Sequence, residues 1–208
     1  MLIVIIGING RMGRKLYNKY KGMYDIIGVD LNPLDGVEVY NNIKDIDKKI
    51  DLVLDFSSPN AIDNIIYALE NNITVISGTT GYTKEEIKKL YEIGNGLFYW
   101  SCNYSKGIPL FIRLLKLCMD KYDVFDFVEI HTSTKKDLPS GTAKMLADEL
   151  DIPYDKIQSL RIDRAPAIHE IIYSSANERI SIKHEVINHD AFIEGLDHVL
   201  NEICSKEK

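Results

Sequence analysis

The chain has 208 residues, of which 45% are hydrophobic, and this is enough for one large or two small domains with a buried core. Its formal net charge of -6 argues against a nucleic-acid-binding protein, and no apolar run reaches the roughly 20 residues that span a bilayer. The three cysteines, Cys102, Cys118 and Cys204, form no CxxC pattern, so neither a disulfide framework nor a zinc or other metal site is indicated. The apolar start has no basic region and no small-residue cleavage site, so we expect no signal peptide and a cytoplasmic location.

Strands and helices alternate over the first half of the chain. Five short apolar runs are predicted strands: Leu2–Ile6, Ile26–Val29, Leu52–Phe56, Thr74–Ser77 and Leu97–Trp100. Three segments between them are predicted helices: Arg11–Tyr20, Pro59–Asn71 and Lys84–Ile93. This alternation predicts an α/β fold with a parallel, Rossmann-like sheet and right-handed crossovers.

The pattern changes after Asn103. We predict a helix, a strand and a second helix, over Ile108–Asp120, Asp126–His131 and Gly141–Leu150. Three predicted strands follow without intervening helices: Ile157–Ile162, Ile168–Ser174 and Arg179–Val186. This succession predicts a meander with one covered and one polar face, in an α+β domain inserted after the α/β domain. The amphipathic segment Ala191–Cys204 predicts a final helix.

A glycine loop, Gly7-x-x-Gly10-x-x-Gly13, lies between the first strand and the first helix. Glycine permits a tight turn there and lets the backbone approach a pyrophosphate, which the helix N-terminus then attracts. Asp30 ends the second strand, where a carboxylate accepts hydrogen bonds from an adenosine ribose. The order of these features predicts a dinucleotide site; the alternative is a glycine turn that binds no ligand.

Asp30 also bears on the choice of cofactor. Its carboxylate repels the 2′-phosphate of NADPH, and Leu31 and Asn32, which follow it, offer no cation. We therefore predict a preference for NADH over NADPH. Basic side chains of the first helix would weaken that preference if they reached the 2′ position, although a solvated helix face is the commoner role of such residues: Arg11, Arg14 and Lys15.

A second candidate site lies in the segment from His131 to Thr142. Ser140 is a plausible N-cap, so the N–H groups of Gly141 and Thr142 would be available to a carboxylate. Lys135 can neutralise that carboxylate or donate a proton, and His131 can act as a general acid near neutral pH. The alternative is a surface histidine and lysine beside an ordinary capped helix.

The chain resembles the dihydrodipicolinate reductases of bacterial lysine biosynthesis, also called 4-hydroxy-tetrahydrodipicolinate reductases, over most of its length. Five motifs carry the resemblance: Gly7-x-x-Gly10-Arg11-Met12-Gly13, Asp55-Phe56-Ser57 with Pro59, Gly78-Thr79-Thr80-Gly81, Asn103-Tyr104-Ser105 with Gly107, and Glu129-Ile130-His131 leading to Lys135-x-Asp137-x-Pro139-Ser140-Gly141-Thr142-Ala143.

The resemblance implies a role for residues in each motif. His131 and Lys135 fall on the catalytic positions of the family. The implied substrate-binding residues are Thr132, Ser140, Gly141 and Thr142. The implied cofactor-binding residues are Gly7, Asn9, Gly10, Arg11, Met12, Gly13, Asp30, Phe56, Ser57, Gly78, Thr79, Thr80, Asn103, Tyr104 and Ser105.

The resemblance also implies an architecture and a reaction. Residues 1–103 and 190–208 would form the dinucleotide-binding domain, and residues 104–189 a substrate-binding and oligomerisation domain, with the two domains closing over both ligands. Family members are usually homotetramers. The implied activity is the NADH- or NADPH-dependent reduction of 4-hydroxy-tetrahydrodipicolinate, a small dicarboxylate, to tetrahydrodipicolinate.

The sequence departs from the family pattern at several positions. Thr132 stands where a second histidine is usual, His189 where an arginine is common and Ala167 where a glycine is usual, and the chain is shorter than most members. We interpret His169 and His184 as structural. Two other classes stay open: a different dinucleotide-dependent oxidoreductase, such as a small amino-acid or imine dehydrogenase, and a non-catalytic NADH-binding module.

Overall fold

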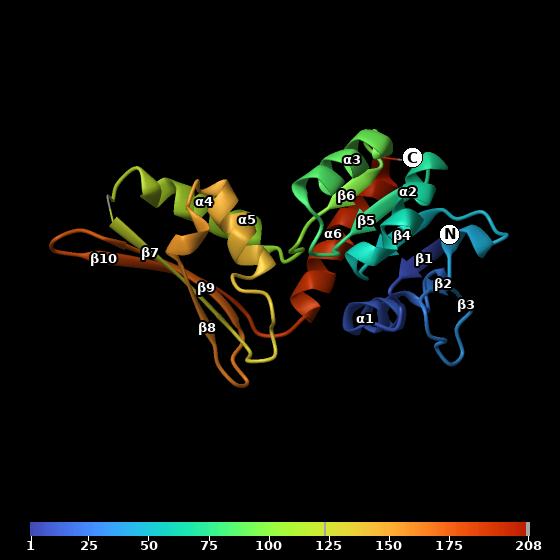
Figure 1. The fold of residues 1–208 in the computed structure, drawn as a ribbon, viewed down its shortest axis with the longest axis horizontal. Coiled ribbons are helices and arrows are strands. Elements are labelled where there is room, and N and C mark those ends of the chain that lie inside the picture. The colour runs from blue at the N-terminus through green and yellow to red at the C-terminus, as the bar shows by residue number, and fades with distance from the viewer. Residues whose placement is uncertain (123, 207–208) are drawn as a thin grey trace. The chain divides into compact units, whose positions relative to one another are not determined.

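A computed structural model describes residues 1–122 and 124–206, with side chains over 1–122 and 125–203, and it divides into two compact units (Figure 1). The first unit is Met1–Cys102 and the second is Asn103–Lys208. No helix within the described ranges is long and apolar enough to cross a membrane. The expected return of residues 190–208 to the first domain stays a prediction, and residues 207–208 and the side chain of Cys204 lie outside what the structure describes.

The first unit contains a six-stranded sheet whose paired strands all run parallel, which confirms the predicted Rossmann-like fold. The strand order is β3-β2-β1-β4-β5-β6. The strands are β1 (Leu2–Ile6), β2 (Asp25–Val29), β3 (Val39–Tyr40), β4 (Leu52–Asp55), β5 (Thr74–Ser77) and β6 (Phe98–Trp100). The strand β3 was not predicted, because two residues are too few to show a period.

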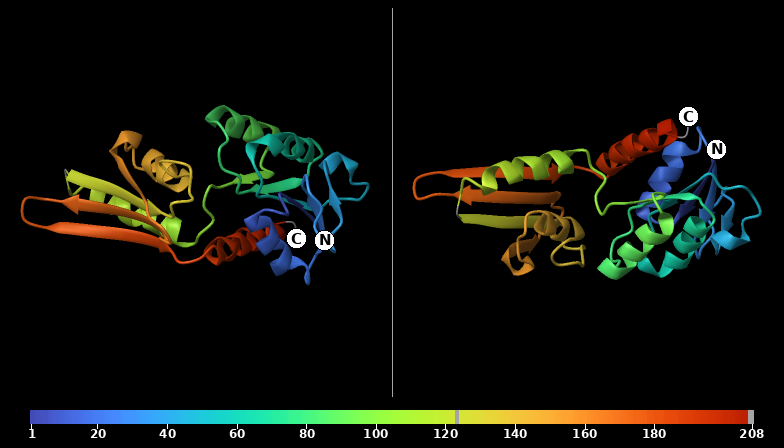
Figure 2. Two further views of the ribbon diagram at one scale, coloured as in Figure 1. Left: turned by 60° about the horizontal axis from the view of Figure 1, so that its bottom comes forward. Right: turned by 90° about the horizontal axis from the view of Figure 1, so that it is seen from above.

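Helices cover both faces of this sheet (Figures 1 and 2). The helices are α1 (Arg11–Tyr20), α2 (Ile62–Glu70) and α3 (Lys84–Gly94), with 3₁₀ turns η1 (Ile43–Asp45) and η2 (Pro59–Ala61). In the figures α1 lies on one face, and α2 and α3 lie on the other. A capping box formed by Thr83 and Glu86 begins α3, and Asn95 ends it in the left-handed conformation.

The second unit contains a mixed four-stranded sheet of order β10-β9-β7-β8. Its strands are β7 (Val124–His131), β8 (Ile157–Arg161), β9 (Ala167–Ser174) and β10 (Arg179–Val186). Its helices are α4 (Gly107–Met119), α5 (Gly141–Glu149) and α6 (Asp190–Lys206), with a 3₁₀ turn η3 (Tyr154–Lys156).

The predicted meander is wrong in one respect. Strands β9 and β10 form an antiparallel hairpin as expected, but β7 lies between β8 and β9. Strand β8 runs parallel to β7 because the chain returns through α5, and such a crossover produces a parallel pair. Local hydrophobic patterns identify strands but carry no information about which strands become neighbours.

One face of the second sheet packs against α4 and α5. Their apolar residues share a core with alternate residues of β7, β8 and β9, which include Phe127, Ile157 and Ile171. Since side chains two apart in a strand lie on the same face, Glu129 and His131 follow Phe127 onto this covered face. Two ionisable groups therefore lie at the edge of an apolar core, where burial strengthens their interactions.

Candidate active site

The glycine loop has the backbone that close contact with a phosphate requires. Gly7 has φ +78°, and a Cβ there would lie 2.8 Å from the Phe56 carbonyl oxygen. A Cβ on Gly13 would lie 2.6 Å from the Cα of Ile8, so only glycine lets α1 begin this close to β1. The loop therefore fits the predicted dinucleotide by its shape as well as by its motif.

A cavity of about 510 Å³ opens beside this loop, at the carboxyl end of the parallel strands. Ligands of open α/β sheets bind at this end. Five predicted cofactor residues line the cavity: Gly7, Gly10, Asp30, Phe56 and Ser57. Several polar residues that the sequence analysis did not single out also line it: Asn41, Asn42, Ser58, Asn60, Asp63 and Asn64. They follow β3 or precede and begin α2, and no recognisable motif marks them.

The carboxylate of Asp30 is held by backbone N–H groups at the cavity wall. One oxygen accepts from Asn9 N at 3.0 Å and the other from Asn32 N at 3.1 Å. The Arg14 guanidinium binds Asn9, with Nε donating to its carbonyl oxygen and Nη2 to its side-chain oxygen, both at 3.0 Å. Asn9 thus joins the glycine loop to the segment after β2. Arg11 and Met12 begin α1 directly after this loop.

A buried carboxylate, Asp55, connects the loops after β4 and β5. It accepts hydrogen bonds from the hydroxyls of Ser57 at 2.5 Å, Ser77 at 2.6 Å and Tyr82 at 3.2 Å. Ser57 N also donates to Thr79 Oγ1 at 2.9 Å, which brings two predicted cofactor residues together. Burial raises the pKa of Asp55, and the hydrogen bonds from these hydroxyls only partly offset that effect.

Glycine is also required after β5. A Cβ on Gly78 would collide with the ring of Phe56, so the predicted cofactor residues of the two loops pack directly against each other. Thr79 is 2% exposed, and its carbonyl accepts from Trp100 Nε1 at 2.8 Å. Thr80 follows in the same loop. These contacts hold in place the loop that is predicted to lie near the nicotinamide.

In the second unit, the predicted cofactor residues Asn103, Tyr104 and Ser105 precede α4. Asn103 Nδ2 donates to Thr142 Oγ1 at 3.2 Å, and Ser105 N donates to Asn103 Oδ1 at 2.9 Å. A predicted cofactor residue therefore contacts a predicted substrate residue. Tyr104 lies against α6, where a Cβ on Gly195 would collide with its carbonyl oxygen.

The helix α5 and Lys135 together hold a carboxylate. Asp137 places one oxygen 2.7 Å from Lys135 Nζ, and its other oxygen accepts from Gly141 N at 3.1 Å. Burial opposes ionisation of Asp137, but the contact with Lys135 outweighs it and lowers the pKa of this carboxyl. The lysine and the helix N-terminus, which the sequence analysis assigned to a substrate carboxylate, therefore bind a carboxylate of the chain itself.

Ser140 is the N-cap of α5, as predicted. Its hydroxyl accepts from Ala143 N at 3.2 Å, and its own N–H donates to Glu129 at 3.0 Å. Ser140 is 1% exposed, and its hydroxyl also lies 3.3 Å from Nε2 of His169. Thr132 follows β7 and is half-buried, and its carbonyl accepts from Lys135 N at 3.0 Å. The substrate roles of both residues stay predictions.

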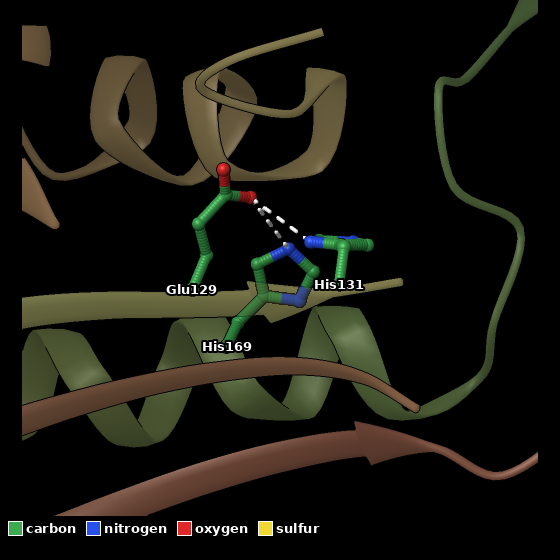
Figure 3. Close-up of side chains that lie close together, drawn as sticks. All are labelled: Glu129, His131 and His169. Carbon is green, nitrogen blue, oxygen red and sulfur yellow. Dashed lines mark ion pairs between the residues drawn. The ribbon is translucent and has the colours of Figure 1, made fainter. Parts of the chain in front are cut away.

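Three buried ionisable side chains, Glu129, His131 and His169, lie together beside this helix start (Figure 3). His131 Nδ1 lies 3.3 Å from Glu129 Oε2, and His169 Nε2 lies 3.9 Å from the same oxygen. The two imidazole rings meet edge to face with centroids 5.2 Å apart. The Arg161 guanidinium lies 3.1 Å from the other carboxylate oxygen.

Sequence reasoning found His131 but missed these partners. Glu129 lies two residues before His131 in a strand, so its place on the same face was predictable. Arg161 and His169 come from strands on either side of β7, and only the strand order brings them to Glu129. His169 was interpreted as structural; the structure places it in contact distance of the predicted catalytic histidine. His184 lies 3.4 Å from Ser105 Oγ.

Comparisons with known proteins agree with both halves of the molecule. The family model "Dihydrodipicolinate reductase, N-terminus" matches residues 1–103, and "Dihydrodipicolinate reductase, C-terminus" matches residues 107–208. Among curated relatives, the 4-hydroxy-tetrahydrodipicolinate reductase of Clostridium novyi (strain NT) is 30% identical over 93% of this chain and 88% of its own. That of Caldanaerobacter subterraneus subsp. tengcongensis is 33% identical over 91% and 87%.

A solved structure has the same fold. The dipicolinate-bound dihydrodipicolinate reductase of Paenisporosarcina sp. TG-14 superposes with a TM-score of 0.76 at 19% identity, over 98% of this chain and 94% of its own. The relatives at 30% identity or more and the family models that together span nearly the whole chain lead to one conclusion. The chain belongs to the dihydrodipicolinate reductase family.

Proposed function

We propose that the chain reduces 4-hydroxy-tetrahydrodipicolinate to tetrahydrodipicolinate with NADH or NADPH, in the biosynthesis of diaminopimelate and lysine. Family membership and the names of the relatives support this reaction. The structural observation that supports this reaction at the candidate site is the contact made by Asp137. Its carboxylate lies 2.7 Å from Lys135 Nζ and accepts from Gly141 N at 3.1 Å. A site that binds a carboxylate of the chain in this way is built to receive one carboxylate of a dicarboxylate substrate.

The residues of the glycine loop and the cavity beside it fit a dinucleotide. Gly7 and Gly10 line the cavity, and because they have no side chains their backbone is open to a phosphate. The Asp30 carboxylate lies at the cavity wall. A bound nicotinamide supplies the hydride, which adds to C4 of the ring that forms when the substrate loses its hydroxyl as water.

The residues of the second unit then hold the substrate and supply a proton. Gly141 and Thr142, with Lys135, orient a carboxylate so that C4 is presented to the hydride donor. Hydride addition places electron density on the conjugated imine of the ring, and a proton from Lys135 or His131 quenches it. His131 is 6% exposed and lies beside the start of α5, which suits a proton donor shielded from bulk water.

For the cofactor, we propose a preference for NADH. The Asp30 carboxylate lines the cavity and is fixed there by two backbone N–H groups. Arg14, a cation that would weaken the preference, binds Asn9 through two hydrogen bonds. A fixed negative charge at this position disfavours the additional phosphate of NADPH.

We also propose a homotetramer assembled through the second unit, and a cytoplasmic location. The face of the four-stranded sheet opposite the core has apolar side chains that keep partial exposure, among them Val128, Ile130 and Ile172, and Leu160 is 47% exposed. A sheet face of this kind is suited to burial against a second copy. Size-exclusion chromatography with light scattering tests this assembly.

The test of the proposed function is oxidation of NADH and NADPH by the purified chain. The substrate is made in the cuvette from pyruvate and aspartate semialdehyde by the preceding synthase. We expect oxidation that depends on the synthase and is faster with NADH. Tight NADH binding without oxidation would reject the proposed reaction and favour a binding module, whereas oxidation with other imines only would favour a different dehydrogenase.

A further inference from the structure

The carboxylate of Glu129 has two oxygens in different surroundings. The first oxygen, Oε1, accepts from Ser140 N at 3.0 Å and from Ser159 Oγ at 2.7 Å, and lies 3.1 Å from Arg161 Nη2. The second oxygen, Oε2, lies 3.3 Å from His131 Nδ1, and no hydrogen bond within the described residues satisfies either of these two buried atoms. The side chain is 0% exposed, so water does not compete for either oxygen.

Glu129 is an anion in this environment. Burial alone would raise the pKa of its carboxyl, but the contacts with His131, Ser140 and Ser159 outweigh burial and hold the pKa well below its ordinary value. An ionised carboxylate only accepts hydrogen bonds. The atom of His131 that faces Oε2 must therefore carry a proton, because a lone pair on Nδ1 would meet the lone pairs and charge of Oε2.

We propose that Glu129 is a positioning residue that keeps a proton on Nδ1 of His131, so that Nε2 is the atom that takes up a proton from solvent and then donates it to the substrate. The proposal rests on the proposed function for what Nε2 does, but the tautomer itself is a property of the protein without ligands. A carboxylate that orients a catalytic imidazole in this way is known to matter for rate, because the wrong tautomer presents the wrong atom.

The neighbours of this pair restrict the ring further. His169 is 1% exposed, and burial together with the nearby His131 lowers its pKa to about 3, so it is uncharged at neutral pH. Its ring meets that of His131 at an interplanar angle of 71°, which leaves His131 little freedom to rotate away from Glu129. Figure 3 shows both imidazoles directed at one carboxylate oxygen.

The same three side chains could in principle hold a divalent cation, since their ligand atoms lie within 4.8 Å of one another. The Arg161 guanidinium already neutralises Glu129 from the side of Oε1. A divalent ion would then leave a net charge of about +2 in a buried cluster, which is costly. We therefore favour the tautomer role and treat metal binding as an outcome of the test.

The decisive variant is Glu129→Gln, because its amide has only one favourable orientation. Ser140 N, Ser159 Oγ and Arg161 all direct donors at Oε1, so the amide oxygen must take that place. The amide NH₂ then faces Nδ1 of His131 and donates to it. Nδ1 then accepts a hydrogen bond from the amide instead of facing an anion, and the ring proton moves to Nε2.

The readout is the tautomer of His131 by NMR, on ring-labelled protein without ligands at a pH where the imidazole is uncharged. The chain has five histidines, and His131→Gln assigns the signal. We expect the Nδ1–H form in the wild type and the Nε2–H form in Glu129→Gln. The control is Ser159→Ala, which removes a donor from the other oxygen and should leave the tautomer unchanged.

The proposal is overturned by an Nε2–H tautomer in the wild type, or by the same tautomer in wild type and Glu129→Gln. The wild-type measurement decides even if the variant fails to fold. Binding of added Zn²⁺ that shifts the ring signals of both His131 and His169 would overturn it in favour of a metal site.

Kinetics connect the tautomer to the reaction. If the wild type is an active reductase, we expect kcat of Glu129→Gln to be about 100-fold lower than that of the wild type, with an unchanged KM for NADH. We expect kcat of Ser159→Ala to stay close to the wild-type value. A wild type that shows the expected tautomer but no reductase activity would contradict the proposed function and leave the tautomer role intact. Full activity with the tautomer reversed would contradict the positioning role alone.

Discussion

Each of the two units contains a fully buried carboxylate near the carboxyl end of a strand. The pKa values of these two carboxyl groups are shifted in opposite directions. Asp55 in the first unit and Glu129 in the second are both 0% exposed. Burial raises the pKa of Asp55, whose partners are hydroxyls. Burial also opposes ionisation of Glu129, but the contacts with His131, Ser140 and Ser159 outweigh burial and lower its pKa. Both carboxylates accept from hydroxyls, and Glu129 in addition contacts an imidazole, a backbone N–H and, 3.1 Å away, the Arg161 guanidinium.

This difference agrees with the role that we propose for each unit. The first unit offers glycine backbone, hydroxyls, amide side chains and the Asp30 carboxylate to a dinucleotide. The second unit offers buried ionisable side chains, which suit the proposed orientation of a charged substrate and transfer of a proton. A change of charge in one unit should therefore alter the role proposed for that unit and leave the role of the other unchanged.

The largest effect is expected from Lys135→Ala. Loss of the cation removes both a carboxylate contact and a candidate proton donor, so kcat/KM should fall by about 100-fold or more. NADH affinity, measured by fluorescence titration, should stay nearly the same, because the cofactor cavity lies in the first unit. The matched control is Lys136→Ala at the neighbouring exposed lysine. Full activity of Lys135→Ala would show that the site is wrongly assigned.

Removing each buried charge should change stability with opposite dependence on pH. Glu129→Gln should destabilise the protein by about 3 kcal/mol at neutral pH, because it leaves Arg161 without its anion. The folded pKa of Glu129 lies below its ordinary value of 4.5, so its contribution is present above pH 4.5 and is lost as the pH falls. The difference between wild type and variant should therefore shrink on acidification.

Asp55→Asn should show the reverse. The folded pKa of Asp55 lies above its ordinary value of 3.8, so the wild type loses stability as the pH rises from 3.8 through the folded pKa. The variant has no carboxyl group to ionise at this position and does not lose this stability. Its free energy of unfolding should therefore rise relative to that of the wild type as the pH increases from 3.8 through the folded pKa. Urea unfolding at a series of pH values measures both variants. A parallel pH dependence of the two differences would break the comparison.

A smaller effect is expected at the cofactor cavity. Asp30→Asn removes the negative charge at the wall and should shift the ratio of kcat/KM for NADPH to that for NADH about tenfold toward NADPH, or roughly 1.4 kcal/mol. Asp35→Asn makes the same change in net charge at an exposed residue that does not line the cavity. An equal shift in the control would mean that long-range charge, rather than Asp30, sets the preference.

The smallest effect is expected at Asp137. Its carboxylate occupies Lys135 Nζ and Gly141 N, so Asp137→Asn should weaken this competition and tighten binding of dipicolinate about fivefold, or roughly 1 kcal/mol. Calorimetric titration measures this affinity, and Asp155→Asn at an exposed position provides the control. Weaker binding by Asp137→Asn would show that Asp137 orients Lys135 for the ligand instead of competing with it.

Much of the fold was predictable because its signals are local. The buried run Leu2–Ile6 and the helix Arg11–Tyr20 have the predicted bounds, and Ser140 caps α5 as expected. The glycine loop was predictable for the same reason, since Gly7 and Gly13 are required by contacts within a few residues or with the adjacent strand. Hydrophobic period, caps and turn residues act over one or two turns of chain.

The sequence by itself determined the two-part α/β and α+β organisation, the dinucleotide loop and the segment that holds His131 and Lys135. Only the tertiary structure decided that β7 lies between β8 and β9, and this order brings Arg161 and His169 to Glu129 from neighbouring strands. Strand pairing joins residues far apart in the chain, and the free energy that selects one order comes from packing of the whole sheet rather than from any local pattern.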